Sequence, residues 1–574
     1  MLRCLLVLFM LAPPAPADPR LELLSAMRAE LDRSMTRLKL PGYEPPYFLG
    51  YTVRDYESYD VGGKFGAVYQ STRNRVRQAY VEVRVGDYGF DNTANDSTEP
   101  PFEIDDFEKY SPGPEAPIDN DPAALRGSLW LLTDYRYKRA LAALHKKRGQ
   151  RATTVVEDEQ VPSFARAPAV KHLDPPLPLK FDAALWSDRV RRTTALLKRF
   201  PEVFDVSMKV SADKLTRYLV NSEGSSIVSE RVLYSVHIEA AARAGDGMYL
   251  EHSKSFYGRT PEEMPTDAQL EKAATELAAE LRALRDAPMF DPYTGPAILL
   301  PQAAGVFFHE ALGHRLEGER QNDEKEGRTF KGQLGRTVLP PFVTVLDDPT
   351  QARAAGKSLN GHYQYDDEGV AARPVPLIDH GILRNYLMSR TPIKGALSSN
   401  GHGRSEATSK PMGRMGNTVV RSDKVVPFAK LKQMLLEEVR RQGKPFGLMV
   451  SDITGGSTNT TNYDYQAFKG MARLVYKVDA KTGKETLVRG VEFVGTPLSE
   501  LNKIIAASDS PDVFNGFCGA ESGFIPVSTV APAVLMREIE LQRTKRGLER
   551  PPVLPSPWGD AGPVKPAAPA KPQQ

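Results

Sequence analysis

Two histidines and a glutamate lie within six residues of one another in the segment His309-Glu310-Ala311-Leu312-Gly313-His314. Two neutral imidazoles can hold a divalent metal ion that acidifies a bound water, and a neighbouring carboxylate can take the proton from that water. The chain has only 9 histidines in 574 residues, so a chance pairing this close would be rare. The motif therefore predicts a metal site beside the carboxylate Glu310.

The spacing of the two histidines does not suit a regular helix. They are five positions apart, whereas the familiar zinc-peptidase helix has them four apart, on one face. Five residues turn through about 500°, which leaves His314 about 140° away from the face of His309. A one-residue π-bulge would bring the rings together. Unwinding of the helix at Gly313 would also do so, because glycine tolerates non-helical backbone angles, and the sequence leaves both distortions open.

A catalytic zinc ion usually takes three protein ligands and a water, so a third ligand is needed. Cys518 is the most economical candidate, because it would be an unpaired thiol in an exported chain. An inert buried cysteine is the alternative interpretation. The other candidates for the third ligand are Glu317, Glu319, His362 and His402.

The first 17 residues have the three-part pattern of a secretory signal. Arg3 precedes the apolar run Cys4–Ala12, and Ala15-Pro16-Ala17 has the small-x-small pattern of a cleavage site. The run has nine residues, far fewer than the ~20 that cross a bilayer as a helix. We expect an exported protein, periplasmic or secreted, with no stable membrane span.

The length and composition favour a globular protein of two domains. A chain of 574 residues is too long for one ordinary domain, and 41% hydrophobic with 26% charged residues is typical of a globular fold. The 75 Lys and Arg against 72 Asp and Glu give a net charge of +3, without the basic surface of a nucleic-acid binder. Two cysteines are too few for a disulfide scaffold.

Helix and strand patterns place a domain boundary near residue 290. The N-terminal domain, 18–290, combines both patterns, and its segment 91–180 is a largely irregular, Pro-rich elaboration. The C-terminal domain, 291–548, opens with a short buried strand and the helix that carries the histidine motif, and is otherwise mostly β. The predicted fold class is therefore α+β. Residues 549–574 are Pro-rich and predicted to be a disordered tail.

Individual elements follow from hydrophobic periodicity and turn residues. The predicted helices cover 21–40, 123–147, 183–198, 266–284 and 429–441, and a further helix starts at Pro301. The predicted strands cover 47–53, 78–85, 203–210, 217–220, 226–241 and 295–300, with hairpins at 375–388 and 471–494 and an apolar segment at 526–541. Thr266 and Gln269 form a predicted capping box.

Several other polar groups have simpler interpretations. Arg404, in the segment Asn400–Arg404, could present its guanidinium to a peptide carboxylate, although a glycine-rich turn is the preferred interpretation. The acidic run Asp366–Glu368 is interpreted as a solvated turn, and residues 91–122 as an exposed loop. His380 is expected at the tip of a hairpin.

The histidine motif and the segments after it resemble the TldD/PmbA family of metallopeptidases, whose signature is His-Glu-x-x-x-His. The resembling segments are 293–318, 366–369, 376–381, 400–404, 411–417, 447–453 and 518–519. In that family zinc is held by the two motif histidines and a cysteine near the C-terminus. The resemblance thus implies His309, His314 and Cys518 as zinc ligands and Glu310 as general base.

The resemblance also implies a substrate class and a partner. Family members degrade small or unfolded peptides inside a closed cavity and form dimers of an active with an inactive subunit. This chain keeps the full motif and is similar to the active type, so we expect a homodimer or a dimer with a TldE/PmbA-like subunit. Two other functions stay open: a non-catalytic scaffold with a structural metal, and a hydrolase of a non-peptide amide.

Overall fold

The computed structural model describes residues 18–93, 111–153, 161–322, 329–458, 468–495 and 497–544. The predicted signal segment and the predicted Pro-rich tail lie outside these residues. Helices and mostly antiparallel strands together make up the fold, which confirms the predicted α+β class. The domain boundary near residue 290 stays a prediction.

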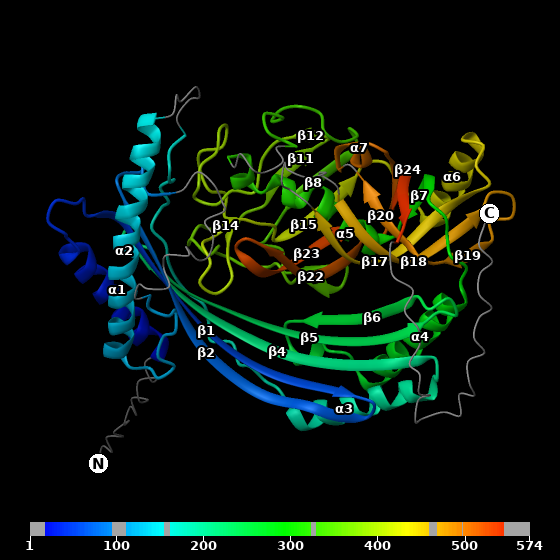
Figure 1. Ribbon diagram of the computed structural model, residues 1–574, viewed down its shortest axis with the longest axis horizontal. Coiled ribbons are helices and arrows are strands. Elements are labelled where there is room, and N and C mark those ends of the chain that lie inside the picture. The colour runs from blue at the N-terminus through cyan, green and yellow to red at the C-terminus, as the bar shows by residue number, and fades with distance from the viewer. Residues whose placement is uncertain are drawn as a thin grey trace, which may run out of the picture.

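One large curved sheet forms the base of the molecule (Figure 1). Its strand order is β2-β1-β4-β5-β3, and β6 also pairs with β5. All neighbours are antiparallel except β3 and β5. The bounds are β1 Pro46–Lys64, β2 Ala67–Val85, β3 Lys171–Leu173, β4 Val203–Asn221, β5 Ser226–Arg243 and β6 Tyr249–Gly258.

The strands of this sheet are longer than the sequence predicts. β1, β2 and β4 each have 19 residues, a length of roughly 60 Å. Two strands were predicted where β4 is continuous, and that prediction is wrong. The polar middle of β4 is paired with β1 on one side and β5 on the other, so main-chain pairing continues where the hydrophobic pattern stops.

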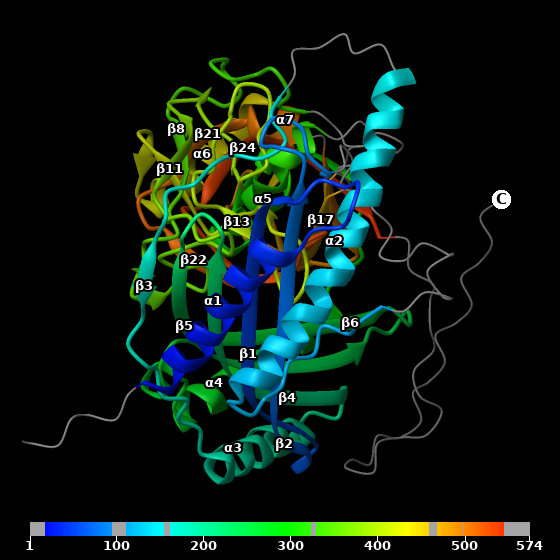
Figure 2. The ribbon, with the colours of Figure 1, turned by 90° about the vertical axis from the view of Figure 1, so that its left-hand side faces the viewer.

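Four helices cover this sheet. Their bounds are α1 Pro19–Arg37, α2 Pro122–Thr153, α3 Ala183–Leu196 and α4 Asp267–Asp286. α1 and α2 pack at one end of the sheet (Figures 1 and 2), whereas α3 and α4 pack together against another part of it, in a core that also includes Leu474 of the C-terminal half. The predicted capping box of α4 is confirmed, since Thr266 and Gln269 each accept a hydrogen bond from the other's main-chain N–H.

The segment after β2 is not simply an exposed loop. Asp91 is completely buried, and its carboxylate accepts hydrogen bonds from Tyr47 Oη at 2.7 Å and Arg84 Nη1 at 2.9 Å. Within the described part of this segment, the loop prediction is therefore wrong at its start. Residues 94–110 lie outside the described residues.

The C-terminal half contains two larger sheets. The first has the order β12-β11-β8-β15-β23-β22, with bounds β8 Val343–Asp347, β11 Val375–Asp379, β12 Ile382–Leu383, β15 Asn417–Ser422, β22 Asp512–Ala520 and β23 Gly523–Ala531. The second has the order β16-β21-β24-β20-β18-β17-β7, and β19 also pairs with β18. Its bounds are β7 Tyr293–Leu299, β16 Val425–Val426, β17 Phe446–Thr458, β18 Phe468–Asp479, β19 Glu485–Val488, β20 Val491–Gly495, β21 Ile504–Ser508 and β24 Val534–Arg543.

The helix with the histidine motif is buried between these sheets. α5, Pro301–Ala311, follows β7 directly and contacts β17 on one side and the β22–β23 hairpin on the other. Every residue from Ala303 to Ala311 is buried, as expected of a helix that is largely apolar all round. The remaining elements are α6 Phe428–Arg441, α7 Pro497–Leu501 and the short pairs β9 Arg353–Ala354 with β10 Lys357–Ser358, and β13 Gly403–Arg404 with β14 Met412–Gly413.

The predicted β segments of this half are confirmed in position but not in extent. β11 and β12 form the first hairpin, with His380 at its tip at a φ of 47°. β12 is, however, only two residues long. The return arm of the second hairpin is split into β19 and β20 around Gly490, and the segment 526–541 spans parts of both β23 and β24.

The acidic run 366–368 connects the two halves of the molecule, so its interpretation as a solvated turn is wrong. Asp366 is 1% exposed. Asp367 forms ion pairs with Arg54 of β1, at 3.1 Å, and with Arg217 of β4, at 2.5 Å. These pairs tie a C-terminal loop to the large N-terminal sheet. None of the helices in the described residues is both long and apolar enough to cross a bilayer.

Candidate metal centre

The structure brings the two motif histidines and the distant cysteine together. Sγ of Cys518, on β22, lies 3.2 Å from Nε2 of His309 and 3.3 Å from Nε2 of His314. The three ligand atoms all lie within 4.8 Å of one another, and the side chains are buried. Cys518 is 209 residues from His309 along the chain. The site therefore exists only in the folded protein.

These three residues fit a zinc ion. In a tetrahedral site, Zn–S of about 2.3 Å and Zn–N of about 2.1 Å place sulfur and nitrogen about 3.6 Å apart. The observed separations of 3.2 and 3.3 Å are slightly shorter. Zinc also prefers imidazole and thiolate ligands, whereas the hard cations magnesium and calcium prefer oxygen ligands. Within the described residues this cluster offers three protein ligands.

The backbone after α5 explains how histidines five positions apart can meet. α5 ends at Ala311, and Leu312 leaves the helix with φ −118° and ψ −55°. A 3₁₀ turn, Gly313–Leu316, then carries His314. Of the two predicted distortions, the structure shows unwinding, but it begins at Leu312, one residue before Gly313.

Gly313 is required for packing, not for unusual backbone angles. It is absent from the residues with positive φ, so an ordinary side chain would not be excluded by backbone strain. A Cβ at this position would, however, lie 2.0 Å from Sδ of Met415. The glycine thus lets the turn with His314 approach the 412–418 segment closely.

Glu310 lies in the last turn of α5, beside strand β17. It is 7% exposed, and a Cβ on Gly456 would lie only 2.1 Å from its Cγ. Only a glycine leaves room for the carboxylate here. Burial raises the pKa of Glu310, although His309 and His314 oppose the shift. A carboxylate with a raised pKa accepts a proton more readily near neutral pH.

The neighbours of Cys518 favour the ionised form of its thiol. Burial alone would raise its pKa, but the two imidazoles outweigh that effect and hold the pKa well below its usual value. The thiolate is the form that binds metal.

Glu317 orients His314. Its Oε1 lies 3.1 Å from Nδ1 of His314, which leaves Nε2 of that ring free to face the sulfur. Glu317 is completely buried and pairs with Arg320 at 2.8 Å and with Arg414 at 3.1 Å. Burial opposes its charge, but His314 and the arginines hold its pKa well below the usual range. Glu317 therefore supports a ligand.

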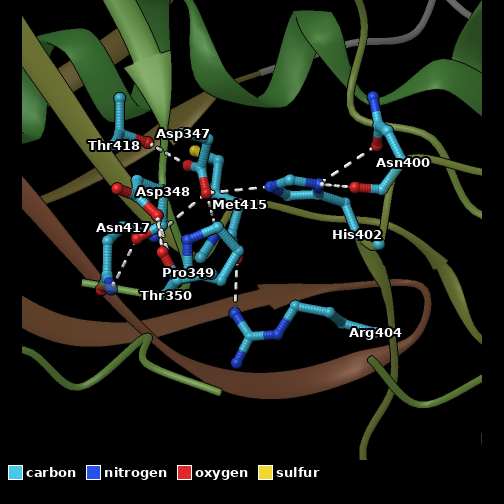
Figure 3. Close-up of polar contacts among 12 residues, drawn as sticks. Asp347, Asp348, Pro349, Thr350, Asn400, His402, Arg404, Met415, Asn417 and Thr418 are labelled. Atoms are coloured by element: carbon cyan, nitrogen blue, oxygen red, sulfur yellow. Dashed lines mark hydrogen bonds and ion pairs between the residues drawn. The ribbon is translucent and has the colours of Figure 1, made fainter. Parts of the chain in front are cut away.

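The other candidate ligands lie elsewhere. Glu319 accepts hydrogen bonds from Ser389 Oγ and Gly413 N. Nδ1 of His362 lies 2.9 Å from the carbonyl of Pro349. His402 lies between Asp347 and Asn400 (Figure 3). In the described residues none of the three joins His309, His314 and Cys518.

Arg404 is not presented to a ligand, which corrects the possibility that it binds a peptide carboxylate. It is 4% exposed. Its guanidinium donates to the carbonyl of Met415 (Figure 3) and to that of Pro526. Arg404 instead ties the 412–418 segment to β23.

Sequence reasoning missed two residues of this site, Arg414 and Gly456. Arg414 lies in the 411–417 segment that carries the family resemblance, but nothing local marks it as a neighbour of Cys518. Gly456 belongs to a pair of glycines inside a strand, a pattern that often marks a close approach of another group. That signal was available in the sequence.

Comparisons with known proteins relate the C-terminal half to metallopeptidases. Residues 292–543 match the family model of the PmbA/TldA metallopeptidase C-terminal domain. A metalloprotease of Methanocaldococcus jannaschii is 31% identical over 315 residues, which are 54% of this chain and 64% of that protein. A zinc metalloprotease TldD homolog of Saccharolobus solfataricus is 24% identical over 351 residues, 59% of this chain and 72% of that protein.

The solved structure of TldE from Thermococcus kodakarensis has a TM-score of 0.59 and 14% identity, covering 90% of this chain and 100% of that one. At this identity the likeness shows the fold. The alignment with the M. jannaschii relative spans just under two thirds of that protein's length. The C-terminal half is thus a metallopeptidase-type domain with a buried His-His-Cys cluster. Over residues 292–543 the chain is similar to the TldD/PmbA family.

Proposed function

We propose that this protein is a zinc-dependent peptidase that hydrolyses small or unfolded peptides. The observation that carries the proposal is the convergence of His309, His314 and Cys518 on one point, with Glu310 next to it in the chain. When bound, zinc would supply a Lewis acid that polarises a carbonyl and makes water a better nucleophile.

Each residue of the site has a distinct role in this proposal. His309, His314 and Cys518 would hold the ion, and Glu317 keeps the ring of His314 in place. Glu310 takes the proton of the attacking water and then delivers it to the nitrogen of the departing amine. Its raised pKa suits both transfers, because the carboxyl group must be a base first and an acid afterwards.

The three-ligand cluster favours catalysis over a structural metal. A structural zinc is usually enclosed by four protein ligands, whereas a catalytic zinc keeps one position for water or substrate. The described residues supply three. The printed names of the relatives, metalloprotease and zinc metalloprotease, support the same class.

We further propose export and a dimeric state. The signal pattern in residues 1–17 supports export, and mass spectrometry of the purified protein would test cleavage after Ala17. The likeness of the fold to a protein named TldE supports a partner of that type or a second copy. Light scattering of the protein, alone and with a TldE-like subunit, would distinguish the two.

Elemental analysis is the decisive test of the metal site. We expect zinc in the parent chain and its loss in His309→Ala and Cys518→Ser. Incubation of the parent with peptide and cell-wall muropeptide pools would then identify the amide that is cleaved. A parent chain that binds no zinc would contradict the proposal.

A further inference from the structure

A buried arginine lies against the sulfur of the proposed zinc site. Arg414 is completely buried, and its Nη2 donates to Sγ of Cys518 at 3.1 Å and to the carbonyl oxygen of the same residue at 2.8 Å. One guanidinium nitrogen therefore contacts both the side chain and the main chain of a single ligand. This pair of contacts fixes where the thiolate lies.

The other nitrogens of Arg414 reach the second side of the site. Nε lies 3.1 Å from Oε1 of Glu317, the carboxylate that also contacts His314. Nη1 donates to Ser522 Oγ at 2.8 Å and to the carbonyl of Gly523 at 3.2 Å. Arg414 thus links two of the three ligands, one directly and one through Glu317.

The main chain that carries Arg414 is itself anchored. Its N–H donates to the carbonyl of His402 at 3.0 Å. Two and three residues further on, Gly416 and Asn417 donate their N–H groups to Asp347. The arginine therefore extends from a segment whose main chain is held in place. A side chain that positions another group needs this support.

We propose that Arg414 is a positioning residue that sets the place of the Cys518 thiolate relative to the two imidazoles. The inference rests on the proposed function. The planar guanidinium donates to the sulfur, two carbonyls and a hydroxyl while its charge lies beside the Glu317 carboxylate, an arrangement that the point charge of a lysine cannot reproduce. The positive charge would by itself repel a metal ion, but buried Glu317 offsets it. The contribution of Arg414 is therefore geometric.

The test is made on the full chain loaded with cobalt(II) in place of zinc. A hydrogen bond to sulfur lowers the energy of its lone pairs, so its removal moves the sulfur-to-cobalt charge-transfer absorption to longer wavelength. We expect this shift in Arg414→Gln and in Arg414→Lys, since lysine keeps the charge but not the fork. Zinc affinity, measured by chelator competition, should fall by about 10- to 100-fold.

Arg404→Lys is the matched control, because Arg404 is another buried arginine that bonds to main-chain carbonyls and touches none of the proposed metal ligands. It should lower thermal stability and leave the cobalt spectrum unchanged. Arg414 variants with the parent spectrum and zinc affinity would overturn the proposal, whatever their stability.

A milder variant keeps the test decisive if the Arg414 variants do not fold. Ser522→Ala removes only one contact at the far end of the guanidinium. We expect a smaller shift of the charge-transfer band in the same direction, and in this case an unshifted band would overturn the proposal. A parent chain that binds neither zinc nor cobalt would instead refute the proposed function, which separates the two failures.

Discussion

Two buried histidine clusters lie close together in the C-terminal half, and the polar contacts of their histidines differ. In the first, His309 and His314 both turn Nε2 toward the sulfur of Cys518. In the second, His402 has Asp347 at 3.2 Å from Nε2 and Asn400 at 3.1 Å from Nδ1 (Figure 3).

The difference lies in where the polar atoms find partners. Asp347 also accepts hydrogen bonds from Thr418 Oγ1 and from two main-chain N–H groups, so the second cluster is complete without a ligand. In the first, three ligand atoms converge on one point, and the buried Nδ1 of His309 has no hydrogen-bond partner among the described residues. Convergence, and not the mere presence of histidine and acid, identifies the metal centre.

The strongest test of this contrast removes one histidine from each cluster. His314→Ala should lose bound zinc and with it all peptidase activity, because two ligands hold the ion poorly. His402→Ala should fold less stably but retain zinc. Elemental analysis of both purified proteins makes the measurement, and equal zinc loss in the two variants would remove the distinction.

A second test separates metal binding from proton transfer within the first cluster. Glu310→Gln should keep the zinc content of the parent and lower kcat by about 10²- to 10⁴-fold, the usual contribution of a general base. The measurement is the rate of peptide hydrolysis at saturating zinc. A variant that turns over at the parental rate would exclude Glu310 as the base.

The third test concerns the second cluster. Asp347→Ala leaves His402, Thr418 and two N–H groups without their buried partner, so the free energy of unfolding should fall by about 3 kcal/mol. Urea unfolding followed by fluorescence measures it. Thr418→Val, which removes one of these bonds, should cost about 1 kcal/mol. An Asp347→Ala protein as stable as the parent would show that this network is not structural.

The smallest expected effect is a pH dependence beside the second cluster. Asp366 accepts a hydrogen bond from Gly403 N, and burial, with the help of neighbouring Asp367, raises its pKa to about 6. The folded state therefore binds this proton more tightly than the unfolded state, and its contribution to stability is lost as the pH rises from about 4 to about 6.

Asp366→Asn removes this titration. As the pH rises from 4 to 7, the unfolding free energy of the variant should therefore increase by about 2 kcal/mol relative to that of the parent. Urea titrations at several pH values measure the change. Parallel stability curves for the two proteins would contradict the assignment.

Local patterns in the sequence predicted most helices well, because a helix is stabilised by contacts three and four residues apart. The capping box at Thr266 and the start of α5 at Pro301 are examples. Strand lengths were predicted poorly. Residues 67–76 of β2 are mostly exposed polar positions that pair with β1 across the hairpin, so no hydrophobic alternation marks them as a strand.

The sequence by itself determined the set of reactive groups: two histidines, a glutamate and one cysteine whose types suit zinc. Only the tertiary structure decided that the helix unwinds after Ala311, that Cys518 meets both rings, and that Arg404 is enclosed whereas Arg414 reaches the sulfur. The physical reason is that the ability to bind a metal ion is a property of each side chain, which its residue type reveals. Burial, pairing and the direction of a guanidinium depend on residues up to about two hundred positions away, which local spacing does not encode.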